Sequence, residues 1–129
     1  MKKIYTIILL IFATITNASA ISQEDAKHII RQEVDAAAKM YVGNDIDYMT
    51  TAAAIFFDEQ DVHYVYVIDE DYCALKDLNL DAVKYNAIRY WNDSQFDYFR
   101  SCLQALGGRI VYTYVGGKSR VSRTFYIYP

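Results

Sequence analysis

Two stretches of this chain are typical of β-hairpins, and they constrain its fold more than any other feature. Residues 48–57 and 62–68 are rich in threonine, β-branched and aromatic residues, and a compact run of polar residues separates them. Residues 109–115 and 120–128 repeat this pattern around a Gly-Gly-Lys-Ser turn, the strongest turn signal in the chain. The sequence therefore predicts two antiparallel strand pairs.

Helical patterns flank and separate the two hairpins. Residues 22–42 place apolar side chains at spacings of three and four, with Ser22 and Asp25 as an N-terminal capping pair and a glycine after the last turn. Residues 93–106 show a second apolar stripe that ends at two consecutive glycines. Residues 80–91 fit helical spacing, but they also alternate well enough for a strand, so both assignments stay open.

These segments together predict an α+β domain that spans residues 21–129. We expect a four-stranded antiparallel sheet made of the two hairpins, with the N-terminal helix and a central helical segment packed on one face and one disulfide. The order of the strands does not follow from the sequence.

The first twenty residues resemble a secretory signal peptide. Lys2 and Lys3 precede an apolar run over residues 5–16, and Ala18 and Ala20 supply the small side chains that a signal peptidase requires. The apolar run is too short for a lasting membrane anchor, and no cysteine follows the expected cut for lipid attachment. We therefore expect residues 1–20 to be cleaved and the protein to be exported by a bacterium, to the periplasm or to the extracellular space.

Cys73 and Cys102 are the two cysteines of the chain. Two cysteines in an oxidising compartment usually pair, and their separation excludes a Cys-x-x-Cys redox motif. The chain has only two histidines to complete a zinc site, so a zinc site is a weaker interpretation than a disulfide. The sequence thus predicts a disulfide between Cys73 and Cys102.

The charge balance is acidic and uneven. The net charge of −3 becomes about −5 without Lys2 and Lys3, which argues against nucleic acid and anionic membranes as partners. Residues 44–71 contain eight acids and no lysine or arginine, whereas residues 107–129 contain basic residues and no acid. Either these regions are neighbours whose charges complement each other, or they form a bipolar surface that steers a charged partner.

No catalytic motif emerges from the sequence. His28 and His63 lack a linked nucleophile, and the glycine pairs match neither a phosphate-binding loop nor a dinucleotide fingerprint. Acids cluster at 58–61 and 69–71, where a metal or a hydrolase site is conceivable, but acids in turns commonly serve turn formation and solubility. We therefore expect a protein without catalytic activity, cofactor or metal.

Tyrosine is the unusual component, at 13 of 129 residues. Tyrosine gives large, stiff contact area at low entropic cost, although it can equally fill a small core. We expect an exposed aromatic patch for partner binding across neighbouring strands, rimmed by charged residues. Its predicted members are Tyr64, Tyr66, Tyr112 and Tyr114, with Asp69, Arg120 and Arg123 at the rim.

These features favour an exported binding protein, of the kind represented by inhibitors and immunity proteins, that occludes a partner protein through a tyrosine-rich sheet surface. A carrier of a small ligand or glycan is the alternative, and a deep aromatic pocket in place of a flat patch would distinguish it. A structural envelope protein that dimerises along a sheet edge is a further hypothesis.

Overall fold

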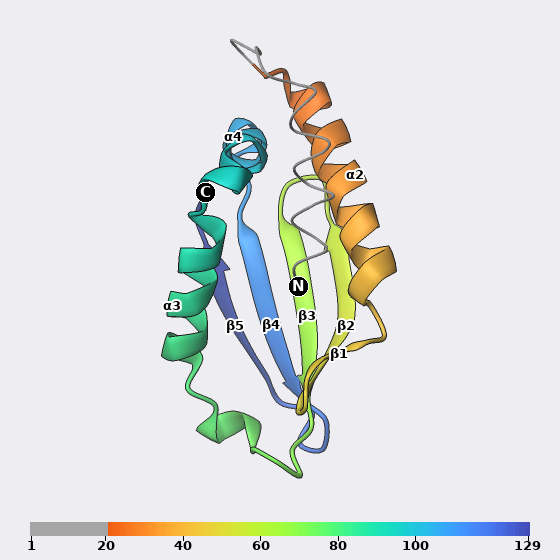
Figure 1. Ribbon diagram of the computed structural model, residues 1–129, viewed down its shortest axis with the longest axis vertical. Coiled ribbons are helices and arrows are strands. Elements are labelled where there is room, and N and C mark those ends of the chain that lie inside the picture. Colours follow the sequence, from red (N-terminus) through yellow and green to blue (C-terminus); the bar gives the residue numbers. More distant parts are fainter. Residues whose placement is uncertain (1–20) are drawn as a thin grey trace.

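The computed structural model describes residues 21–129 and contains one mixed sheet with helices beside it (Figure 1). Its five strands follow the order of the chain, β1-β2-β3-β4-β5. The strands are β1 (Asp45–Asp47), β2 (Thr50–Phe57), β3 (Val62–Ile68), β4 (Ile110–Gly116) and β5 (Ser122–Ile127). The predicted signal peptide and its cleavage site lie outside the described residues.

Both predicted hairpins are confirmed, as β2–β3 and β4–β5. The prediction of a four-stranded antiparallel sheet is wrong, because β3 and β4 pair in parallel and a short strand, β1, is added at the edge beside β2. The parallel pairing arises because the chain leaves β3 at one end of the sheet and returns to the opposite end before β4 begins. Such a crossover needs a long connection, which residues 69–109 supply.

Three α-helices are described: α2 (Gln23–Tyr41), α3 (Leu80–Trp91) and α4 (Asp97–Leu106). The Ser22 hydroxyl accepts a hydrogen bond from the backbone N–H of Asp25 at the start of α2, as the capping pattern predicted. Gly107, in the left-handed conformation, ends α4. The ambiguous segment is helical, and the Asn79 side chain caps it by accepting from the N–H of Ala82.

The helices pack on the sheet with unequal closeness. In α2, six residues are buried, including Ile30 and Val34, whereas in α3 only Ala87 and Trp91 are buried. Figure 1 shows α2 along the β2 side of the sheet, α3 along the β5 side, and α4 at one end. Within residues 21–129, none of the helices has the length and hydrophobicity needed to cross a bilayer.

Glu70 ties the end of β3 to the β4–β5 turn. Its carboxylate accepts backbone N–H groups from Leu75, Lys118 and Ser119 at 3.0, 2.9 and 2.7 Å. These hydrogen bonds lower the pKa of Glu70 to about 2. A Cβ at Gly116 would lie 2.3 Å from this carboxylate, so a larger residue there would push the carboxylate away from these N–H groups.

The predicted disulfide is wrong, because Cys73 and Cys102 are both free thiols. Cys73 lies in the loop after β3, whereas Cys102 is buried in α4 at the other end of the sheet (Figure 1). The ends of a seven-residue strand such as β4 are about 20 Å apart, far beyond the Cα separation of about 7 Å that a disulfide tolerates.

We expect two titratable thiols in the denatured protein without any reducing agent, as measured with a chromogenic thiol reagent. In the folded protein, half-buried Cys73 should react well before Cys102, because burial raises the pKa of the Cys102 thiol to about 11. A Cys73→Ser variant should retain one slow thiol, and Cys102→Ser one fast thiol. Denatured protein with no reactive thiol would contradict the structure.

Candidate functional site

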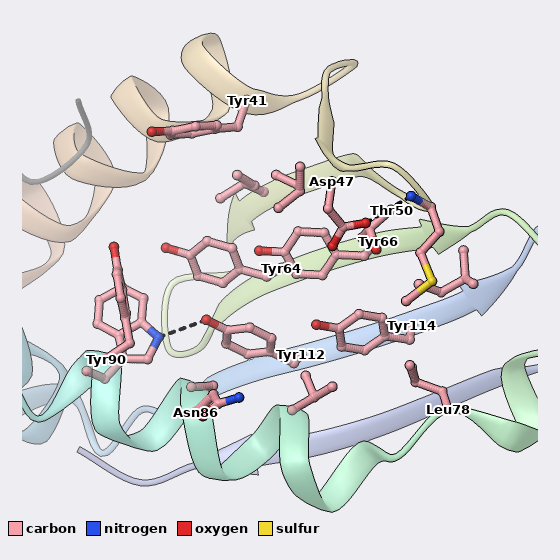
Figure 2. A pocket seen from close by; sticks show the side chains of 17 residues that line it. Tyr41, Asp47, Thr50, Tyr64, Tyr66, Leu78, Asn86, Tyr90, Tyr112 and Tyr114 are labelled. Carbon is pink, nitrogen blue, oxygen red and sulfur yellow. Dashed lines mark hydrogen bonds between the residues drawn. The ribbon is translucent and has the colours of Figure 1, made fainter. Parts of the chain in front are cut away.

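A cleft of about 420 Å³ opens between α3 and the sheet, on the face that also carries α2 (Figure 2). Its volume lies within the range of about 300–1,000 Å³ typical of ligand sites. Strands β3 and β4 form the floor, α3 forms one wall, and β1 with the end of α2 forms the other. The lining residues are Tyr41, Ile46, Asp47, Met49, Thr50, Ile55, Tyr64, Tyr66, Ile68, Leu78, Val83, Asn86, Ala87, Tyr90, Trp91, Tyr112 and Tyr114.

Four tyrosines form the floor because β3 and β4 pair in parallel and in register. Tyr64 lies opposite Tyr112, and Tyr66 lies opposite Tyr114, all on one face of the sheet. The rings of each cross-strand pair stack with centroids 5.2 Å apart. Figure 2 shows the four rings side by side with their hydroxyls directed the same way along the cleft. The floor is therefore a continuous aromatic surface carrying a row of phenol oxygens.

Trp91 closes one end of this row. Its indole Nε1–H donates a hydrogen bond of 2.9 Å to the Tyr112 hydroxyl (Figure 2), and its ring lies 5.9 Å from that of Tyr64. Trp91 is 2% exposed and also contacts Phe96 and Phe99. This hydrogen bond attaches the last turn of α3 to β4, so it sets one end of the cleft wall.

Asp47, the last residue of β1, lies on the β1 side of the cleft, above the floor (Figure 2). Its carboxylate accepts the backbone N–H of Met49 at 3.0 Å, and no basic side chain pairs with it among the described residues. Burial, followed by the nearby charge of Asp47, raises the pKa of the Tyr114 hydroxyl to about 12. The phenols thus remain neutral, and Asp47 is the acidic residue of the lining.

The structure brings the four predicted tyrosines together, but not as an exposed patch. Tyr64, Tyr112 and Tyr114 are only 7–8% exposed, because α3 and the β1 region rise on either side of them. The predicted rim residues do not line the cleft: Asp69 caps a turn at the N–H of Asp71, and Arg123 donates to the carbonyl oxygens of Leu75 and Leu78. Arg120 is exposed in the loop before β5, with a positive φ of 62°.

The wall residues were not predicted as site residues. Val83, Asn86 and Ala87 come from α3, whose assignment the sequence left open, and Asp47 comes from a strand of three residues. The helical spacing of Leu80, Val83 and Ala87 was the one available signal. It indicates an inner face, but the inner face of a helix looks the same whether it covers a core or borders a cleft.

Among residues 21–129, two buried polar groups on the α2 side lack hydrogen-bond partners. Glu33, which is 3% exposed, has both carboxylate oxygens unpaired, and the hydroxyl of Tyr41 is also buried and unpaired. Burial raises the pKa of Glu33 to about 7. The pKa of Tyr64 lies well above its usual value, mainly because of burial, and the charge of Glu33 contributes to the shift. Glu33 therefore lies on the buried face of α2, close to the aromatic floor.

Glu33 should make the protein less stable as the pH rises. Its pKa is higher in the folded than in the unfolded state, so its favourable contribution is complete below about pH 4.5 and is lost as the pH passes about 7. The loss should be on the order of 3 kcal/mol in the free energy of unfolding. Urea unfolding between pH 4.5 and 8 should show this decline in the wild type and a much smaller one in Glu33→Gln. The exposed Glu24→Gln should behave like the wild type; equal slopes for Glu33→Gln and the wild type would contradict this interpretation.

The acidic and basic regions of the sequence are neighbours. Asp61 binds the guanidinium of Arg109 at 3.0 Å, and Asp71 pairs with Lys118. This favours the complementary-charge interpretation over the bipolar surface.

A cluster of Asp58, Asp61 and His63 brings three ligand-type atoms within 4.8 Å of one another. However, Asp58 accepts the N–H groups of Gln60 and Asp61 and pairs with the His63 ring at 2.7 Å. Asp61 is likewise engaged by the backbone and side chain of Arg109. The cluster closes the β2–β3 turn and joins it to β4, which accounts for its geometry without an ion.

Comparisons with known proteins identify a shared fold. No protein-family model and no curated protein sequence matches this chain. The chain is similar in structure to EpsS, a pilotin of the type 2 secretion system of Vibrio vulnificus, with a TM-score of 0.58 at 10% identity over 81% of this chain and 89% of that one. It is also similar to a presumed secreted protein of Pseudomonas aeruginosa, with a TM-score of 0.53 at 11% identity over 84% and 95% of the two chains. At these identities the likeness shows that the α+β fold recurs in other bacterial proteins.

Proposed function

We propose that this chain is an exported bacterial binding protein, without catalytic activity, that holds an apolar segment of a partner protein in the aromatic cleft. The observation that carries the proposal is the cleft itself, because α3 stands beside the tyrosine floor without covering it. Occlusion of a partner by a flat exposed patch is therefore replaced, in this proposal, by a groove that accepts inserted side chains.

The shape of the cleft fits a chain segment. Its α3 wall runs from Val83 to Trp91, nine residues or about 12 Å of helix. This length matches side chains on successive turns of a docked helix, the common mode in which an apolar face enters a groove. The floor offers rigid aromatic rings, which are the side chains that most often dominate binding energy at protein interfaces.

The structural neighbours support the same proposal. One is a pilotin of a secretion system and the other a presumed secreted protein, so this fold occurs in the bacterial export context that residues 1–20 predict here. Analogy of fold alone does not establish function, and the proposal therefore depends on the cleft.

A small apolar ligand is the second candidate. The cleft volume and its largely aromatic lining favour it, since compact ligand sites are apolar with a few polar groups. Native mass spectrometry of the purified protein distinguishes this case, because a carried ligand adds a discrete mass that is lost on denaturation.

Filling the cleft from α3 should abolish partner binding. Asn86 is exposed and lines the cleft, so Asn86→Phe places a ring in the groove without disturbing the core. Exposed Ala82 lies on the same helix outside the lining, and Ala82→Phe is the matched control. Each protein serves as bait in envelope extracts of the producing bacterium. The wild type and Ala82→Phe should capture the same partner, and Asn86→Phe should capture roughly tenfold less of it, or even less. Equal retention by all three baits would place the interaction elsewhere.

Export should leave a mature chain that begins at Ile21. N-terminal sequencing of the protein from osmotic-shock fluid or culture medium should read Ile-Ser-Gln-Glu, because Ala18 and Ala20 meet the specificity of signal peptidase. Replacing Ala20 with a bulky residue should slow the cleavage and leave the longer form in the membrane fraction. Native protein that still begins at Met1 in the cytoplasm would contradict export.

A further inference from the structure

We propose that the segment bound in the cleft carries a lysine or arginine whose cationic group lies against Asp47. This inference rests on the proposed function and adds the chemistry of the occupant. It follows from the distribution of charge and hydrogen-bonding groups along the lining.

The lining is electrically one-sided. Among its 17 residues, Asp47 is the one acid and none is lysine, arginine or histidine. The Asp47 carboxylate accepts one backbone hydrogen bond, from Met49, and has no cationic partner among the described residues. An ionised carboxylate can accept several hydrogen bonds, so Asp47 retains capacity for a charged donor.

The aromatic floor also favours a cationic occupant. Figure 2 shows Asp47 on the β1 side of the cleft, above Tyr66 of the floor. Phenol oxygens carry partial negative charge and accept hydrogen bonds, so a cationic donor near them is attracted. An ammonium or guanidinium on an apolar stem can therefore lay its methylene groups on the rings and its charge at Asp47.

An anionic occupant does not fit this arrangement. It would face Asp47 without a compensating cation in the lining. Arg123 is the basic residue on the same sheet face, opposite Tyr114 in β5, but its guanidinium is held by the carbonyl oxygens of Leu75 and Leu78. The hydroxyls of the floor can donate to an anion, yet a neutral phenol does not offset the repulsion from a carboxylate.

Three small probes of equal chain length test the inference on the full chain as the cell produces it: n-hexylammonium, 1-hexanol and hexanoate. Trp91 is the single tryptophan and lines the cleft, so its fluorescence reports occupancy. We expect n-hexylammonium to bind about fivefold more tightly than 1-hexanol, as for a partly exposed charge pair, and hexanoate to bind most weakly. Raising the salt concentration should reduce the difference between the first two probes.

Asp47→Asn should remove the preference for the cation while leaving the affinity for 1-hexanol unchanged, since asparagine can still accept the N–H of Met49. Asp93→Asn is the matched control: Asp93 also accepts an N–H two residues on, from Gln95, but it lies beyond the far end of α3. This variant should keep the wild-type preference. Equal affinities of the wild type for n-hexylammonium and 1-hexanol would overturn the inference. That result would not contradict binding in the cleft, which is tested separately: 1-hexanol should bind to the wild type and fail to bind to Asn86→Phe. A cation preference that persists in Asp47→Asn would also overturn it.

Discussion

The parallel pairing of β3 with β4 is the constraint on which the cleft depends. In-register pairing places Tyr64 beside Tyr112 and Tyr66 beside Tyr114, so four rings from two hairpins become one surface. Side chains alternate between the two faces of a sheet, and a slip of one residue in this pairing would place two of these rings on the opposite face from the other two. The aromatic floor thus exists only because β3 and β4 pair in this register, and neither strand forms it alone.

The same connectivity also supplies the wall. Parallel neighbours require a long crossover, and here the crossover contains α3. Toward the floor, this helix presents Val83, Asn86 and Ala87, which are too small to reach across to the β1 side. Its firm attachment is at one end, where Trp91 is buried and bonded to Tyr112. Small side chains on a helix that is anchored at its end leave the space that larger ones would fill.

Local sequence signals predicted the helices and hairpins well, but they did not predict contacts between segments far apart in the sequence. The cap at Ser22, the glycine at position 107 and both hairpin turns are encoded within a few residues, so the structure confirms them. Strand β1 is too short to carry an alternation pattern. The pairing of the hairpins and the separation of Cys73 from Cys102 depend on the path of the crossover, which periodicity does not encode. Likewise, alternation groups the tyrosines on one face but does not indicate whether a helix covers that face.

Two polar groups on the α2 side of the cleft are placed at a cost to stability. A phenol in a packed core must find a hydrogen-bond partner, and an unpaired buried carboxyl costs more than any apolar side chain of its size. Yet, among residues 21–129, Glu33 and the Tyr41 hydroxyl are buried without hydrogen-bond partners. Folded chains commonly break the rules of core packing at functional sites and compensate elsewhere. Here the exceptions gather on the α2 side of one cleft.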